Sequence, residues 1–216
     1  MHTHEHDHLD LESEPTGPVD PRLHRLWRGQ VAVGATVAAV ALLAFPVWHA
    51  TTVRRALRNI QGGDATLGLA IAIGVAAWCI TATPQPKPAG PHRVGQWVVR
   101  ALAALTMALS ATAWWFGRGH IVTVVLDLLT YPVVLVLLGI GFAYVGRAHR
   151  LFGQRRMAQI ADILGLATPL LWAGSQLLAG YPTVMLWGPG LAVLVLASAC
   201  LTSLAFGALK ARPPPA

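Results

Sequence analysis

Residues 31–48 read VAVGATVAAVALLAFPVW, a stretch without a single charged side chain. A helix rises about 1.5 Å per residue, so about 17–25 apolar residues cross the roughly 30 Å hydrocarbon core of a bilayer. Five further stretches have the same character, and most charged residues fall between them. The sequence therefore predicts an all-α integral membrane protein, a polytopic bundle of six transmembrane helices. The six predicted spans are Val31–Trp48, Thr66–Ala82, Trp97–Phe116, Ile121–Val145, Ile160–Ala179 and Val184–Phe206.

The predicted six-helix transmembrane domain covers residues 27–209 and has a tail at each end. Residues 1–26 are acidic, rich in histidine and interrupted by prolines. Because this segment has too little apolar surface to offset the entropy of ordering, we predict that it is disordered. Residues 210–216 form a short C-terminal tail, and the short loops leave no room for a second globular domain.

The distribution of Lys and Arg predicts the orientation in the membrane. Cytoplasmic loops carry an excess of these residues, and twelve of the sixteen lie on one side if the N-terminus is inside. We therefore predict a multi-pass protein of the cell (cytoplasmic) membrane with both termini in the cytoplasm, and the Arg-rich, Ala-rich composition suggests a bacterial source. The outer segment Val53–Ile60 is the exception, since its basic residues indicate either a helix along the membrane surface or a different pairing of the first two spans. The twelve inner residues are Arg22, Arg25, Arg28, Lys87, Arg93, Arg100, Arg147, Arg150, Arg155, Arg156, Lys210 and Arg212, and the four outer ones are Arg54, Arg55, Arg58 and Arg118.

Small residues recur at helical spacing inside several spans. Small side chains let two helix backbones approach closely, and hydroxyl groups add hydrogen bonds between helices. We therefore predict a tightly packed bundle. The residues concerned include Gly34 and Ala38, Gly68, Ala72 and Ala76, and Ser198 and Thr202. Cys79 and Cys200 also lie inside spans, without a second cysteine or a histidine at metal-ligand spacing, so we interpret them as small buried apolar residues.

Asp127 is the most distinctive single residue, because it lies about seven residues into the fourth predicted span. A carboxylate at that depth is costly unless it faces protein or water, and such residues are candidates for function. Thr123 and Tyr131 lie one turn away on the same helix face, which makes a polar stripe. The stripe predicts a proton carrier, a cation ligand or a counter-ion, and the structural alternative is a hydrogen-bonded carboxyl that joins two helices.

Asp162 begins the fifth predicted span and shares a helix face with Pro169 and Gln176, which follow at intervals of seven residues. Pro169 frees a backbone carbonyl one turn earlier, and the Gln176 amide is able to bond to that carbonyl or to a ligand. On the predicted topology Asp162 and Arg100 both lie near the inner boundary. We expect either an ion pair between them or two side chains that extend separately to the headgroups.

The N-terminus reads MHTHEHDH, so histidine alternates with other residues four times. Neutral imidazole together with carboxylates is a suitable ligand set for Zn, Ni or Cu. We therefore predict a weak metal site in the tail, formed by His2, His4, His6 and His8. No other cofactor is implied by the sequence.

Three classes of function remain open at this point. A non-catalytic membrane subunit, or an assembly or scaffold factor, accounts for the short loops and the lack of reaction motifs. A small secondary transporter or channel for protons, cations or metal ions is favoured by Asp127, Asp162 and the tail. A membrane-embedded enzyme is the third class, although the chain has no HExxH, GxSxG or Gly-rich phosphate motif. The expected partners are the lipid bilayer and other membrane subunits or further copies of this chain, not nucleic acid.

Overall fold

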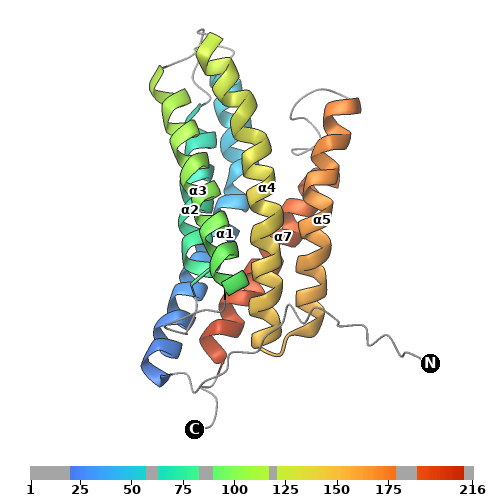
Figure 1. Cartoon of the computed structure of the whole chain (residues 1–216). Coiled ribbons are helices and arrows are strands. Elements are labelled where there is room, and N and C mark those ends of the chain that lie inside the picture. The colour runs from blue at the N-terminus through green and yellow to red at the C-terminus, as the bar shows by residue number, and fades with distance from the viewer. Residues whose placement is uncertain (1–19, 57–62, 83–89, 117–120, 179–188, 212–216) are drawn as a thin grey trace, which may run out of the picture.

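A computed structural model describes residues 20–56, 63–82, 90–116, 121–178 and 189–211. These residues form helices and no strand, which confirms the all-α prediction (Figure 1). The helices are α1 (Pro21–Ala56), α2 (Gly63–Ile80), α3 (Gly90–Phe116), α4 (Ile121–Leu151), α5 (Arg155–Leu178) and α7 (Pro189–Lys210).

The helices stand side by side and run alternately up and down along one bundle axis (Figure 1). Each packs against its neighbours in the chain, and α7 packs against both α5 and α1. The order α1, α2, α3, α4, α5, α7 therefore closes into a ring. This arrangement brings the start of α1 and the end of α7 to the same end of the bundle (Figure 1).

Helix α1 begins earlier than the sequence pattern indicated. The backbone N–H of Arg22 donates a 2.8 Å hydrogen bond to the Asp20 carboxylate, the interaction expected of an N-cap residue with the second residue of its helix. Pro21 is the first helical residue, where its missing N–H has no intrahelical partner to lose. Residues 21–26, which we had expected to belong to the disordered tail, are consequently part of α1.

At its other end α1 continues without interruption through Pro46 to Ala56. The backbone of residues 53–56 therefore extends the first predicted span in line, and a separate surface helix does not begin there. Residues 57–60, the rest of that predicted segment, lie outside the described residues.

Close contacts through small residues confirm the prediction of tight packing. A Cβ atom placed on Gly34 of α1 would lie 2.6 Å from the Cβ of Cys79 and 3.2 Å from the carbonyl oxygen of Ala76, both on α2. Between α1 and α7, the hydroxyl of Ser198 donates a 3.1 Å hydrogen bond to the carbonyl oxygen of Ala39. The helix backbones touch at these positions because no larger side chain separates them.

Three helical segments of the described chain are long and apolar enough to cross a membrane: Pro21–Trp48, Arg93–Thr112 and Gly190–Lys210. Leu67–Ile80 is apolar but shorter. Large apolar side chains also cover much of the outer surface, and Leu166 and Leu170 of α5 are each 70% exposed. A surface of this kind is unfavourable in water and suits contact with lipid. The helices and the surface together indicate a membrane protein.

Candidate functional site at the basic end of the bundle

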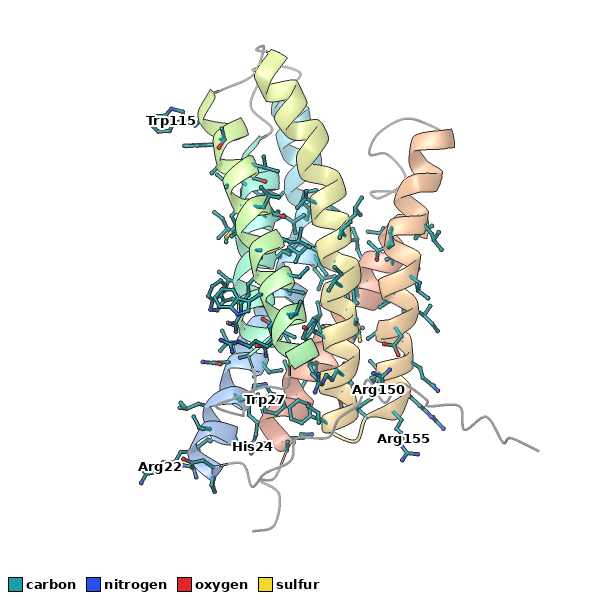
Figure 2. All side chains as sticks on the ribbon, in the orientation of Figure 1. Arg22, His24, Trp27, Trp115, Arg150 and Arg155 are labelled. Carbon is teal, nitrogen blue, oxygen red and sulfur yellow. The ribbon has the colours of Figure 1, made fainter. Side chains whose placement is uncertain are left out.

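Every Lys and Arg whose side chain the structure describes lies toward one end of the bundle, which we call the basic end. The alternation of the helices causes this, since the basic segments are at the starts of α1, α3 and α5 and at the ends of α4 and α7. Figure 2 shows Arg22, Arg150 and Arg155 at this end and Trp115 at the other. The ten Lys and Arg residues at the basic end are Arg22, Arg25, Arg28, Arg93, Arg100, Arg147, Arg150, Arg155, Arg156 and Lys210.

A tight turn between α4 and α5 organises the interior of the basic end. Gly153 has a φ of 72°, a left-handed conformation that residues with a side chain rarely adopt. Its N–H donates to the carbonyl of Arg150 (2.9 Å), and the N–H of Gln154 donates to the carbonyl of His149 (2.8 Å). These two bonds form a Schellman motif, which ends α4 and returns the chain toward it. The turn therefore holds Gln154 against His149.

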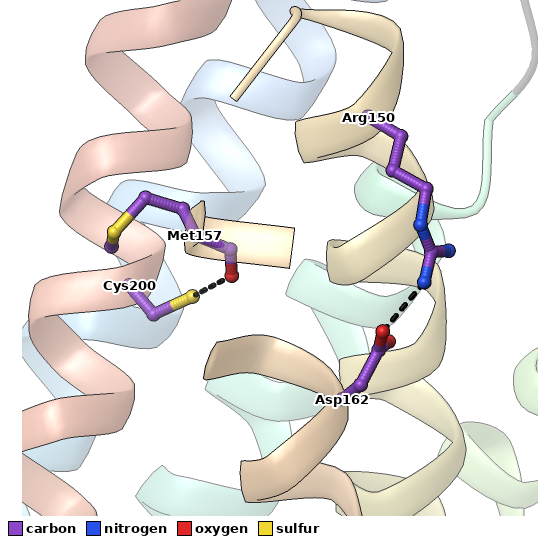
Figure 3. A network of polar contacts seen from close by, with 4 residues as sticks. All are labelled: Arg150, Met157, Asp162 and Cys200. Carbon is purple, nitrogen blue, oxygen red and sulfur yellow. Dashed lines mark hydrogen bonds and ion pairs between the residues drawn. The ribbon is translucent and has the colours of Figure 1, made fainter. Parts of the chain in front are cut away.

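His149 is fully buried and contacts oxygen atoms through both ring nitrogens. Its Nδ1 lies 2.6 Å from Oε1 of Gln154, and its Nε2 lies 3.1 Å from the backbone carbonyl oxygen of Cys200 on α7. The Cys200 thiol is 3.4 Å from the same Nε2, and it also lies 3.7 Å from the carbonyl oxygen of Met157 (Figure 3). We call His149, Gln154 and Cys200 the His149 network. It joins α4, the α4–α5 turn and α7.

Both protonation states of His149 have hydrogen-bond partners in this network. The protonated ring donates from Nδ1 to Gln154 and from Nε2 to the Cys200 carbonyl. The neutral ring with its proton on Nδ1 still donates to Oε1 of Gln154, and its Nε2 accepts a hydrogen bond from the Cys200 thiol, 3.4 Å away. Burial lowers the pKa of His149 below its ordinary value, and the contacts with Gln154 and the Cys200 carbonyl oppose this shift. His149, beyond the predicted end of the fourth span at Val145, is thus a buried titratable group.

Asp162 pairs with Arg150, whose guanidinium nitrogen lies 2.5 Å from its carboxylate (Figure 3). Gly146 makes room for this carboxylate, because a Cβ atom on Gly146 would lie 2.5 Å from Oδ1 of Asp162. The two paired side chains are 47% and 40% exposed, so we expect the ion pair to stabilise the fold by at most about 1 kcal/mol.

The predicted pair between Arg100 and Asp162 is wrong. Arg100 is on α3 and Asp162 is on α5, and α4 packs between these helices. Instead, Nε of Arg100 donates a 3.3 Å hydrogen bond to the hydroxyl of Thr81, and its guanidinium lies 4.8 Å from the ring centre of Trp78. Arg100 therefore contacts the end of α2, and the ring face of Trp78 stabilises its charge.

The remaining predicted site residues are not described at the level of their side chains. The backbones of Thr123, Asp127 and Tyr131 belong to the unbroken helix α4, and that of Gln176 belongs to α5, which also contains Pro169. The side chains of these four residues lie outside the described part of the chain, as do His2, His4, His6 and His8. Within that part, no group of three or more His, Cys, Asp or Glu side chains has the geometry of a metal site.

Sequence reasoning missed His149 and Gln154. A signal was present, since His149 follows the fourth span within the basic segment Arg147–Arg150 and a glycine precedes Gln154. That signal indicates a helix end, but it does not show that the imidazole turns inward toward α7. Cys200 was predicted to be buried, and it is.

Comparison with family models, with curated proteins and with solved structures finds no match to this chain.

Proposed function

We propose that this protein is a non-catalytic subunit, or an assembly or scaffold factor, of a bacterial cell membrane. In this proposal it spans the membrane six times with both termini in the cytoplasm. It acts by binding other membrane subunits or further copies of itself through the outer faces of its helices.

The main observation that supports this proposal is the apolar centre of the ring. Residues of α1, α2, α3, α4 and α7 line a pocket of about 50 Å³ between these helices. Its lining is predominantly apolar and includes Leu42, Ile73, Leu137 and Phe142. An apolar lining of this kind offers water few hydrogen-bond partners, and transfer of an ion into such surroundings is very unfavourable. A packed, apolar centre suits a protein that binds partners better than one that conducts ions.

The outer faces supply surfaces for such partners. On α5 the exposed residues Ile163, Leu166 and Leu170 share one face, and on α1 Val33, Val40 and Val47 do the same. In a bilayer these faces contact either lipid tails or the helices of another subunit.

A second candidate is the transporter or channel for protons, cations or metal ions, and one observation favours it. Thr106 and Ser110 lie one turn apart on α3 and are at least 96% buried, and neither hydroxyl has a hydrogen-bond partner among the described residues. Buried polar groups are usually paired, so an unpaired couple is a candidate for contact with water or an ion. These residues lie in the half of α3 that ends at Phe116, next to the end at which α4 begins.

The first test is ion flux in liposomes. We expect wild-type protein, Asp127→Asn and Ser110→Ala to show the same background proton and cation permeability, because the proposed function needs no pathway. Affinity purification in mild detergent should instead recover membrane subunits or copies of the chain at a constant ratio. Flux by the wild type that either substitution abolishes, while the variant still inserts and purifies normally, would contradict the proposal and support the transporter.

The proposed orientation predicts which cysteine probes are accessible. Arg155 and Trp115 are exposed and lie at opposite ends of the bundle (Figure 2). A membrane-impermeant maleimide added to intact cells should label Trp115→Cys and should label Arg155→Cys only after the cells are opened. Unsubstituted protein is the control, since Cys200 is buried and Cys79 is partly buried. Labelling of Arg155→Cys in intact cells would show that the orientation is the reverse of the one proposed.

A further inference from the structure

A groove at the basic end lies between the α4–α5 turn and the last two turns of α7. We call it the Lys210 groove, and its volume is about 460 Å³. Polar and apolar side chains both contribute to it, and none of the residues that line it is a carboxylate. Its principal residues are Phe152, Gln154, Ser203, Phe206, Gly207 and Lys210.

The polar residues of the groove favour an anion. Lys210 brings a positive charge with three N–H donors, and Ser203 brings a hydroxyl. Gln154 brings an amide whose oxygen is directed to the His149 ring, so that the amide nitrogen is the atom left to donate. Gly207 lets this amide approach α7, because a Cβ atom on Gly207 would lie 2.6 Å from the Gln154 amide nitrogen.

The end of a helix carries a partial negative charge that would repel an anion, but Arg28 of α1 reduces it here. Its guanidinium donates 2.7 Å hydrogen bonds to the carbonyl oxygens of Ala208 and Leu209, both in the last turn of α7. Arg28 thereby satisfies two carbonyl groups at the helix end and adds a second positive charge close to Lys210.

The apolar residues of the groove place it at the membrane boundary. Phe206 is the last residue of the sixth predicted span, and it is 59% exposed. Lys210 follows one turn later on the same face, about 6 Å further along the helix axis. The groove therefore runs from the level of the acyl chains, at Phe206, to the level of the headgroups, at Lys210, and Phe152 of the α4–α5 turn also lines it.

We propose that the Lys210 groove binds an anionic phospholipid, with its phosphate at Lys210 and Gln154 and an acyl chain against Phe152 and Phe206. Two features of the site support this ligand together. The donors and the charge suit a phosphate, and the phenylalanines suit a hydrocarbon chain that a free phosphate ion does not have. Such a lipid would join the α4–α5 turn to α7 on the proposed cytoplasmic side.

The test is native mass spectrometry of the full chain in mild detergent, titrated with phosphatidylglycerol and, separately, with phosphatidylcholine of the same acyl chains. Wild-type protein should bind phosphatidylglycerol several times more tightly. Lys210→Gln removes the charge of an exposed side chain and should weaken phosphatidylglycerol binding about fivefold while leaving phosphatidylcholine binding unchanged. Phe206→Ser should weaken the binding of both lipids.

Arg22→Gln is the matched control, because it removes the same charge from the same end of the bundle but outside the groove. It should change phosphatidylglycerol binding by less than twofold. Equal losses in Lys210→Gln and Arg22→Gln would overturn the proposal in favour of a diffuse attraction to the basic end. Inorganic phosphate that displaces phosphatidylglycerol completely at millimolar concentration would also overturn it, because the acyl chain would then contribute nothing.

Discussion

Gly34→Ala is expected to destabilise the folded bundle by about 1–3 kcal/mol, the usual effect of adding a methyl group to a closely packed interface. The added Cβ atom would lie 2.6 Å from the Cβ of Cys79 and 3.2 Å from the backbone carbonyl oxygen of Ala76. Neither of these atoms is at the free end of a flexible side chain, so α1 and α2 must move apart. Equilibrium unfolding in mixed detergent micelles measures this difference.

Gly29→Ala is the matched control, on the same helix. Gly29 is exposed, and a Cβ atom there meets nothing within 4 Å. Because alanine favours a helix over glycine by about 1 kcal/mol, this variant should be neutral or slightly more stable. Equal destabilisation by both substitutions would show that α1 and α2 do not meet at Gly34.

His149→Ala is the second substitution for which we expect a large loss, about 2–5 kcal/mol, as for other large buried residues cut back to alanine. It would leave a cavity between α4 and α7 and remove the ring that links Gln154 to the Cys200 carbonyl. Arg150→Gln changes the next residue in the chain, whose side chain is 47% exposed, and should cost at most about 1 kcal/mol. A loss as small for His149→Ala as for Arg150→Gln would mean that the ring is not enclosed between these helices.

The His149 network also predicts a dependence of stability on pH. Because burial holds the pKa of His149 below the unfolded value of about 6.5, the unfolded chain takes up this proton first as the pH falls. Stability should therefore be unaffected by this group above about pH 7 and should decrease as the pH falls through about 6.5. His149→Gln has no titratable group at this position, so its unfolding free energy should decrease less over the same range. Parallel profiles for the two proteins would rule out a buried, neutral His149.

Local features of the sequence are enough to determine the helical elements and the end at which the charges gather. An apolar stretch such as residues 31–48 indicates, through its length and composition alone, a helix long and apolar enough to cross a membrane. Short loops then require neighbouring helices to alternate in direction. The basic segments at Arg22–Arg28, Arg93–Arg100 and Arg147–Arg156 consequently come together without any knowledge of packing.

The exact start of α1 is harder to predict from the sequence. Asp20 and Pro21 are individually typical of a disordered tail rich in prolines, and only together, as N-cap and first helical residue, do they begin a helix. Similarly, Gly153 indicates that a helix ends nearby, but its φ of 72° and the two hydrogen bonds around it specify where the chain goes next.

Only the tertiary structure decided which polar side chains meet. Asp162 binds Arg150 and not Arg100, and His149 turns toward Gln154 and Cys200, because the rotation of each helix about its axis sets these pairs. In a water-soluble protein an apolar stripe reveals that rotation. Here exposed and buried faces are both apolar, as in α5, where exposed Leu166 and buried Leu164 are the same residue type. The composition of the helices thus indicates a membrane protein, while close contacts at small residues such as Gly34 and Gly146 determine which faces meet.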